Sequence, residues 1–182
     1  MKTLRTRVLP VLVLLPMLVF VSPLAAQDNS APAWTATDVN GHEVAFPPAS
    51  GPPTVLLFWA TWCPYCKGLM PHLQSLVDEH GDENIRILAV SLFEEDDANP
   101  AAYLAKQGFQ FQLVEKGETI AKQYGVKGTP GLFLVEQGEV VWHLGLARQA
   151  EDRTEGVKGH GLRAARRAPF WAAELRKAVD AL

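Results

Sequence analysis

The two cysteines of this chain are the residues whose type and spacing are best suited to chemistry. Cys63 and Cys66 are separated by two residues, directly after an apolar run and before a segment with helical periodicity. At the N-terminus of a helix, unpaired backbone N–H groups and the positive end of the dipole stabilise a thiolate and lower the pKa of a cysteine below about 8.5. We therefore expect Cys63, at the exposed end of the helix, to be the attacking sulfur. Cys66, one turn deeper, would resolve a mixed disulfide, so that the pair shuttles two electrons.

Three other uses of the cysteine pair remain open from the sequence. An inert disulfide would close so short a loop that it removes little entropy from the unfolded chain. A peroxide-reducing site would place a threonine three residues before its cysteine, whereas Thr61 lies two residues before Cys63. A zinc or copper site would need two further ligands, and sequence spacing brings none of the five histidines beside the pair; they are His42, His72, His80, His143 and His160. The spacing favours a redox dithiol.

The elements that must position the pair are a buried strand and the helix that follows it. The apolar run at 54–60 is too short for a helix and is typical of a strand buried on both faces. From 64 to 80, apolar residues recur at intervals of three and four, and Gly81 offers a stop. A strand at 85–92 and a helix at 100–107 repeat the pattern. This alternation predicts an α/β sheet covered by helices on both faces.

Shorter elements are expected around this framework. Asn40-Gly41 favours a two-residue turn in a hairpin of small edge strands within 34–46. The remaining pattern predicts a strand at 111–114, a helix at 118–124, a hairpin formed by strands at 132–136 and 139–143, and an amphipathic helix at 169–182. The basic stretch at 147–168 is expected to be a solvated loop or the frayed start of the last helix.

The first 26 residues predict a signal peptide, which leaves 27–182 as one domain. Three basic residues precede an apolar stretch at 8–21, and small residues follow it up to Ala26. The apolar stretch is short against the roughly 20 residues of a membrane-spanning helix, although an uncleaved N-terminal anchor is the alternative. Export would place the thiol pair outside the cytoplasm, where it tends to oxidise.

The charge balance limits the classes of partner. The 182 residues contain 17 Lys and Arg against 20 Asp and Glu, which gives a formal net charge of −3 at pH 7. A protein that binds a phosphate backbone normally carries a basic excess, so nucleic acid is not an expected partner.

A second motif lies far downstream of the cysteines. Gly128-Thr129-Pro130 stands directly before the strand expected at 132–136. Together with W-C-x-x-C after a buried strand, this V-x-G-T-P segment resembles the thioredoxin superfamily, in which the matching proline is cis and packs against the redox disulfide. The resemblance implies a cis bond at Pro130 and backbone groups of Thr129 that face a substrate chain. It also implies a thioredoxin-like α/β fold, with a central mixed sheet, helices on both faces and an N-terminal β-hairpin extension.

The hairpin, the F-W-A-T-W-C run and the segment after the second strand resemble the TlpA-like envelope thiol-disulfide oxidoreductases. This resemblance implies a periplasmic enzyme that reduces protein disulfides through its C-P-Y-C dithiol, is recharged by a membrane electron-donor protein and uses no cofactor beyond the Cys63–Cys66 disulfide. The alternatives are a disulfide-donating oxidase or isomerase of the same fold and a copper-binding module. The chain departs from the family pattern at Leu57 and Leu69, where relatives carry polar residues near the buried cysteine. Of these two, Leu69 is expected to lie nearer solvent.

Two groups of further site residues follow. Contacts with a substrate chain are expected from five residues, Trp62, Pro64, Tyr65, Thr129 and Pro130. Transfer of the Cys66 proton is assigned to Glu94, Glu95 or Lys67. The two glutamates follow a strand expected to run parallel to the first, and such strands end at the same edge of a sheet. No residue is assigned to a metal.

Overall fold

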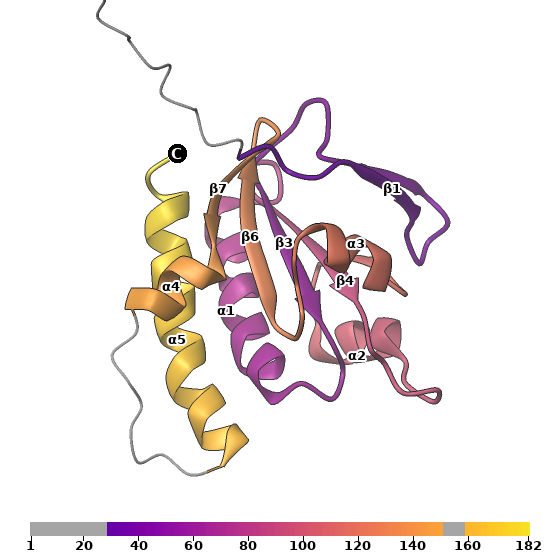
Figure 1. Cartoon of the computed structure of the whole chain (residues 1–182), viewed down its shortest axis with the longest axis vertical. Coiled ribbons are helices and arrows are strands. Elements are labelled where there is room, and N and C mark those ends of the chain that lie inside the picture. Colours follow the sequence, from indigo (N-terminus) through magenta and orange to yellow (C-terminus); the bar gives the residue numbers. More distant parts are fainter. Residues whose placement is uncertain (1–28, 151–158) are drawn as a thin grey trace, which may run out of the picture.

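A mixed sheet forms the centre of the molecule. The computed structural model describes residues 29–150 and 159–182, and its five-stranded sheet has the order β5-β4-β3-β6-β7 (Figure 1). β3 pairs parallel with β4 and antiparallel with β6, as the predicted mixed sheet requires. The strands are β3 (Thr54–Trp59), β4 (Arg86–Ser91), β5 (Gln112–Val114), β6 (Gly131–Glu136) and β7 (Glu139–His143). All six residues of β3 are buried, which explains its uninterrupted apolar sequence.

Two layers cover the sheet, one on each face. Four helices contribute buried residues to one core cluster: α1 (Pro64–His80), α2 (Pro100–Gln107), α4 (Leu144–Ala150) and α5 (His160–Val179). The other cluster is formed with α3 (Glu118–Gln123) and with the separate hairpin of β1 (Trp34–Thr37) and β2 (Glu43–Phe46). The predicted thioredoxin-like architecture, with helices on both faces and an N-terminal hairpin, is confirmed.

The turn of the N-terminal hairpin is longer than the predicted two-residue turn. It spans 38–42, the Asp38 N–H donates to the His42 carbonyl (2.9 Å), and only Gly41 of the Asn40-Gly41 pair has a positive φ, 84°. The reason is the Asp38 carboxylate, which accepts hydrogen bonds from the N–H groups of Asn40 and His42 and from the side chain of Gln112. These hydrogen bonds lower the pKa of Asp38 to about 2, and the bond from Gln112 has the largest effect.

The C-terminal helical region differs most from the prediction. A helix that the sequence did not indicate, α4 (Leu144–Ala150), follows β7 directly, and α5 starts at His160 rather than at 169. Pro169 therefore lies inside α5 instead of at its first turn. The earlier start is explained by packing on α1, because a Cβ placed on Gly68 would lie 3.3 Å from the Cβ of Ala168. Small residues on both helices allow this close approach, and α1 and α5 lie side by side in Figure 1.

The described N-terminal residues extend the edge of the sheet. The Val140 N–H donates to the Asn29 carbonyl and the Ala31 N–H to the Gly138 carbonyl, both at 2.8 Å. The predicted signal peptide precedes this segment and lies outside the described residues. Within 29–150 and 159–182, no helix is long and apolar enough to cross a membrane.

Candidate active site

The site is built around a disulfide at the end of β3. Cys63 and Cys66 are bonded to each other, with their Cα atoms 5.3 Å apart. Cys63 is the N-cap of α1, and the backbone N–H of Cys66 donates a hydrogen bond to the Cys63 Sγ at 3.1 Å. The helix therefore directs an otherwise unpaired N–H group at the first sulfur, which stabilises negative charge there. The position predicted for the pair, between a buried strand and a helix N-terminus, is confirmed.

The first cysteine is less accessible than the sequence suggested. Cys63 is 1% exposed and Cys66 is 0% exposed, so the expectation that Cys63 lies at an exposed helix end is wrong. Both cysteines belong to the apolar core on the α1 face of the sheet. The neighbouring side chain of Trp62 is 48% exposed instead. The surface offered to a partner is therefore made by residues around the disulfide rather than by its sulfur atoms.

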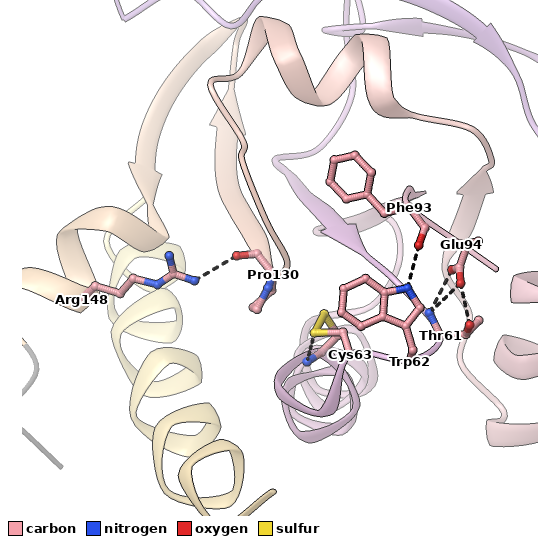
Figure 2. Close-up of a disulfide and its surroundings, with 8 residues drawn as sticks. Thr61, Trp62, Cys63, Phe93, Glu94, Pro130 and Arg148 are labelled. Carbon is pink, nitrogen blue, oxygen red and sulfur yellow. Dashed lines mark hydrogen bonds between the residues drawn. A yellow bond between two sulfur atoms is a disulfide. The ribbon is translucent and has the colours of Figure 1, made fainter. Parts of the chain in front are cut away.

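One side of the disulfide is formed by the loop between β4 and α2. The Glu94 carboxylate accepts hydrogen bonds from the Thr61 N–H (2.9 Å) and the Thr61 hydroxyl (2.5 Å). The Trp62 indole N–H donates to the Phe93 carbonyl at 2.7 Å (Figure 2). The expectation that Glu94 emerges near the active-site loop is confirmed, because β3 and β4 are parallel and end at the same edge. The Glu94 carboxylate therefore holds Thr61, and the Phe93 carbonyl holds Trp62, the residue directly before Cys63.

Phe93 is a site residue that the sequence did not indicate. It has a positive φ of 57°, and its N–H donates to the Glu118 carboxylate at 2.9 Å. Its side chain is 46% exposed, similar to that of Trp62. The two rings thus form an exposed apolar surface beside the disulfide. The sequence could have indicated Phe93 only if its positive φ had been foreseen, and phenylalanine disfavours that backbone conformation.

The other side of the disulfide begins at Pro130. The Thr129–Pro130 peptide bond is cis, as the resemblance implied, and Pro130 is buried. The Pro130 carbonyl accepts a hydrogen bond from the Arg148 guanidinium at 3.1 Å. Figure 2 shows Pro130 and Trp62 on opposite sides of the disulfide. Among the described residues, the buried Thr129 hydroxyl has no hydrogen-bond partner.

Aromatic rings continue this side toward the C-terminal helices. The Arg148 guanidinium lies 5.3 Å from the centre of the Trp171 ring, which lies 5.9 Å from the ring of Tyr65. The centre of the His160 ring lies 6.1 Å from the centre of the Tyr65 ring, and the two rings are nearly perpendicular. These residues line a cavity of about 190 Å³ together with Thr129, Pro130 and Arg167. Sequence reasoning missed Arg148 and His160 as site residues because it did not predict α4 or the first half of α5. Trp171 lies in the predicted part of the last helix, where the sequence indicated only a core residue.

The remaining predicted site residues are Pro64, Lys67 and Glu95. Pro64 occupies the first turn of α1 and is half-buried. The Lys67 ammonium lies 5.6 Å from the centre of the Tyr103 ring, and Glu95 is exposed on the β4–α2 loop. Leu57 and Leu69 are both 0% exposed. The expectation that Leu69 lies nearer solvent is wrong, because α5 covers the outer side of α1.

Comparison with known proteins agrees with this geometry. Residues 28–143 match the AhpC/TSA family. The chain belongs to this family. It is 30% identical over 144 residues to the sporulation thiol-disulfide oxidoreductase A of Bacillus subtilis, covering 74% of this chain and 86% of that relative. It is 29% identical over 130 residues to the thiol-disulfide oxidoreductase ResA of Bacillus thuringiensis, covering 70% of this chain and 74% of the relative.

A solved structure supports the fold independently. The thioredoxin domain of a thiol-disulfide oxidoreductase from Bacteroides vulgatus matches with a TM-score of 0.59 and 19% identity, over 85% of this chain and 98% of that domain. The family match and the two relatives confirm the resemblance to thioredoxin-superfamily oxidoreductases, and this structure confirms the fold. This AhpC/TSA family member is a thiol-disulfide oxidoreductase, and the Cys63–Cys66 pair is its CXXC motif.

Proposed function

We propose that this chain reduces protein disulfides outside the cytoplasm and is then returned to its dithiol form by a membrane electron donor. The observation that carries the proposal is the asymmetry between the two cysteines. Cys63 caps α1 and accepts a hydrogen bond from the Cys66 N–H, whereas Cys66 lies within the helix. One sulfur is thus suited to carry negative charge and attack, and the other to resolve.

Reduction of a substrate would take two exchange steps. The Cys63 thiolate attacks one sulfur of the substrate disulfide, forms a mixed disulfide and releases the other substrate sulfur as a thiolate. Cys66 then loses its proton and attacks the Cys63 sulfur, which releases the second substrate thiolate. Two electrons pass from the enzyme to the substrate, and the enzyme is left with the Cys63–Cys66 disulfide that the structure contains.

The surroundings of the disulfide support a polypeptide as substrate. Trp62 and Phe93 expose apolar rings on one side, and Pro130 lies on the other with Thr129 before it. Within this proposal Trp62, Pro64, Tyr65, Thr129 and Pro130 contact the substrate chain. Such a surface can hold an extended segment while a sulfur atom approaches Cys63.

Removal of the Cys66 proton needs an acceptor, and Glu94 is the best placed of the three candidates. Its carboxylate contacts Thr61 at the start of the active-site loop, whereas Glu95 faces solvent and the Lys67 ammonium lies over Tyr103. A carboxylate at this edge could accept the proton through water.

Export and recharging form the second part of the proposal. The basic, apolar and small-residue pattern of 1–26 supports a cleaved leader. A reductase in an oxidising compartment accumulates as its disulfide unless electrons are supplied, so a membrane dithiol donor is proposed as partner. Sequencing the N-terminus of the exported protein should find a start near Gln27. An intact leader would instead indicate an N-terminal anchor.

The reduction potential of the Cys63–Cys66 couple tests the direction of electron flow. Reference enzymes range from about −270 mV for a reductant to about −120 mV for an oxidant. We expect a value in the reducing half of this range, together with turnover of a disulfide-linked protein. A value near the oxidising end would assign the chain to disulfide donation. Copper titration of the reduced protein separates disulfide reduction and disulfide donation from the copper-binding alternative. That alternative predicts stoichiometric copper binding and no turnover.

A further inference from the structure

A cavity next to the active-site loop has carboxylates on half of its lining residues. It has a volume of about 350 Å³ and lies between the β4–α2 loop and the segment that leads into α3. Its charged lining residues are Glu94, Glu95, Asp96, Glu115, Lys116 and Glu118. We propose that this acidic cavity accepts a lysine or arginine side chain of the polypeptide whose disulfide is reduced. The inference rests on the proposed function, since it names a feature of that function's substrate.

A buried hydroxyl provides evidence for a ligand that does not depend on the acidic residues. Ser91 lines the same cavity and is 0% exposed. Successive side chains of a strand point to opposite faces of the sheet, and Leu88 and Val90 of β4 belong to the cluster on the α3 face. The Ser91 side chain therefore points to the opposite face, which α2 covers. Among the described residues, its hydroxyl has no hydrogen-bond partner. Because a buried hydroxyl without a partner is unfavourable, this oxygen is suited to accept a hydrogen bond from a bound cationic group.

The arrangement of the carboxylates favours an extended organic cation over a chelated metal ion. Within the described part of the chain, no three Asp, Glu, His or Cys side chains gather closely enough to hold a metal. Two of the carboxylates already accept backbone hydrogen bonds, Glu94 from Thr61 and Glu118 from Phe93. The others, Glu95, Asp96 and Glu115, are exposed around the opening. A flexible ammonium or guanidinium side chain can meet such dispersed groups one at a time.

The position of the cavity links charge selection to the redox step. Glu94 belongs both to the cavity lining and to the contact with Thr61, two residues before Cys63. Phe93, adjacent to Glu94, shares its exposed apolar surface with Trp62. A substrate segment that lies on these two rings can therefore place a neighbouring basic residue in the cavity. Attraction between opposite charges would speed encounter as well as strengthen the complex.

The test compares disulfide-linked peptides that differ at one residue beside their cysteine, which is Lys, Gln or Glu. The reduced, full enzyme is mixed with each peptide, and the second-order rate of its oxidation is measured. The Lys peptide should react roughly fivefold faster than the Gln peptide at low ionic strength, and the Glu peptide should be slowest. Added salt should reduce this preference.

Variants locate the source of the preference. The double variant Asp96→Asn/Glu115→Gln removes two charges of the cavity. It keeps Glu94 and Glu118, which hold the loops, and Glu95, which is a proton-transfer candidate. It should lower the Lys-to-Gln rate ratio to about twofold or less. Asp82→Asn/Glu83→Gln, at the far end of α1, removes the same two residue types and should leave the ratio unchanged. Lys116→Gln should raise the ratio, and Ser91→Ala should lower it.

The outcomes separate this inference from the proposed function. Equal rates for the Lys and Gln peptides would overturn the inference while the proposed function stands. An equal fall of the ratio in the cavity variant and in the distant control would also overturn it, because only net charge would then matter. If the Gln peptide fails to oxidise the reduced enzyme at all, the proposed function fails, and the inference falls with it.

Discussion

The two sides of the disulfide are held in place by different forces. On the loop side, Glu94 and Glu118 accept hydrogen bonds from Thr61 and from Phe93. On the helix side, Tyr65, Trp171 and Arg148 are held by contacts between rings and by one hydrogen bond to Pro130. Directional bonds on the loop side fix the backbone before the attacking sulfur, whereas burial on the helix side fixes the shape of the groove. Changes on the loop side should therefore alter rates, and changes on the helix side should mainly alter stability.

The largest expected effect follows from removing the central ring of the helix side. Trp171 is 2% exposed and contacts both Tyr65 and Arg148. Trp171→Ala should lower the free energy of unfolding by about 3–5 kcal/mol, because it leaves a cavity in the core. Denaturant unfolding measures this loss, and Trp171→Phe should recover most of it. A loss below 1 kcal/mol would show that burial does not hold this side together.

On the loop side, Glu94→Ala removes the acceptor for Thr61. We expect a roughly tenfold fall in kcat/KM for disulfide reduction, equivalent to about 1.4 kcal/mol, because the backbone before Cys63 is released. Glu94→Gln retains an acceptor oxygen and should recover part of the rate if positioning is the role of Glu94. If Glu94 accepts the Cys66 proton, the Gln variant should be as slow as the Ala variant and its rate should respond differently to pH. Wild-type rates in both variants would show that Glu94 neither positions Thr61 nor accepts the Cys66 proton.

A smaller effect is expected where the helix side meets Pro130. Arg148→Met removes the hydrogen bond to the Pro130 carbonyl but keeps an apolar side chain against Trp171. The KM for a peptide disulfide should rise roughly threefold with little change in kcat, because the substrate groove is less well fixed. Arg148→Lys serves as the control that keeps the charge. A fall in kcat without a change in KM would contradict a positioning role.

The contrast between the two sides also explains what the sequence could predict. On the loop side, the place of Glu94 was predictable but the role of Phe93 was not. The parallel pairing of β3 and β4 follows from their apolar runs and brings Glu94 to the edge where Cys63 lies. The helix side was not predictable, because α4 and the first half of α5 have no clear apolar periodicity and depend on packing against α1 and the sheet. Their stability is tertiary in origin, so local sequence patterns gave too little signal.

The smallest effect is expected far from both sides, at Asp38 in the N-terminal hairpin. Its pKa is lowered from 3.8 to about 2 by hydrogen bonds from Gln112, His42 and Asn40. A lowered pKa contributes stability that is fully present above pH 3.8 and is lost as the pH falls through 2. Asp38→Asn should therefore be less stable than the wild type at neutral pH, and the difference should shrink between pH 4 and pH 2. Reductase activity at neutral pH should remain, which separates this hairpin from the active site.

The central claim is that Cys63 attacks and Cys66 resolves. The most direct test incubates Cys66→Ser and Cys63→Ser with the same peptide disulfide at neutral pH and follows mixed-disulfide formation by mass spectrometry. Cys66→Ser should accumulate a stable mixed disulfide through Cys63, because no resolving thiol remains, and Cys63→Ser should react far more slowly. Equal rates for the two variants, or a faster reaction of Cys63→Ser, would contradict the assignment.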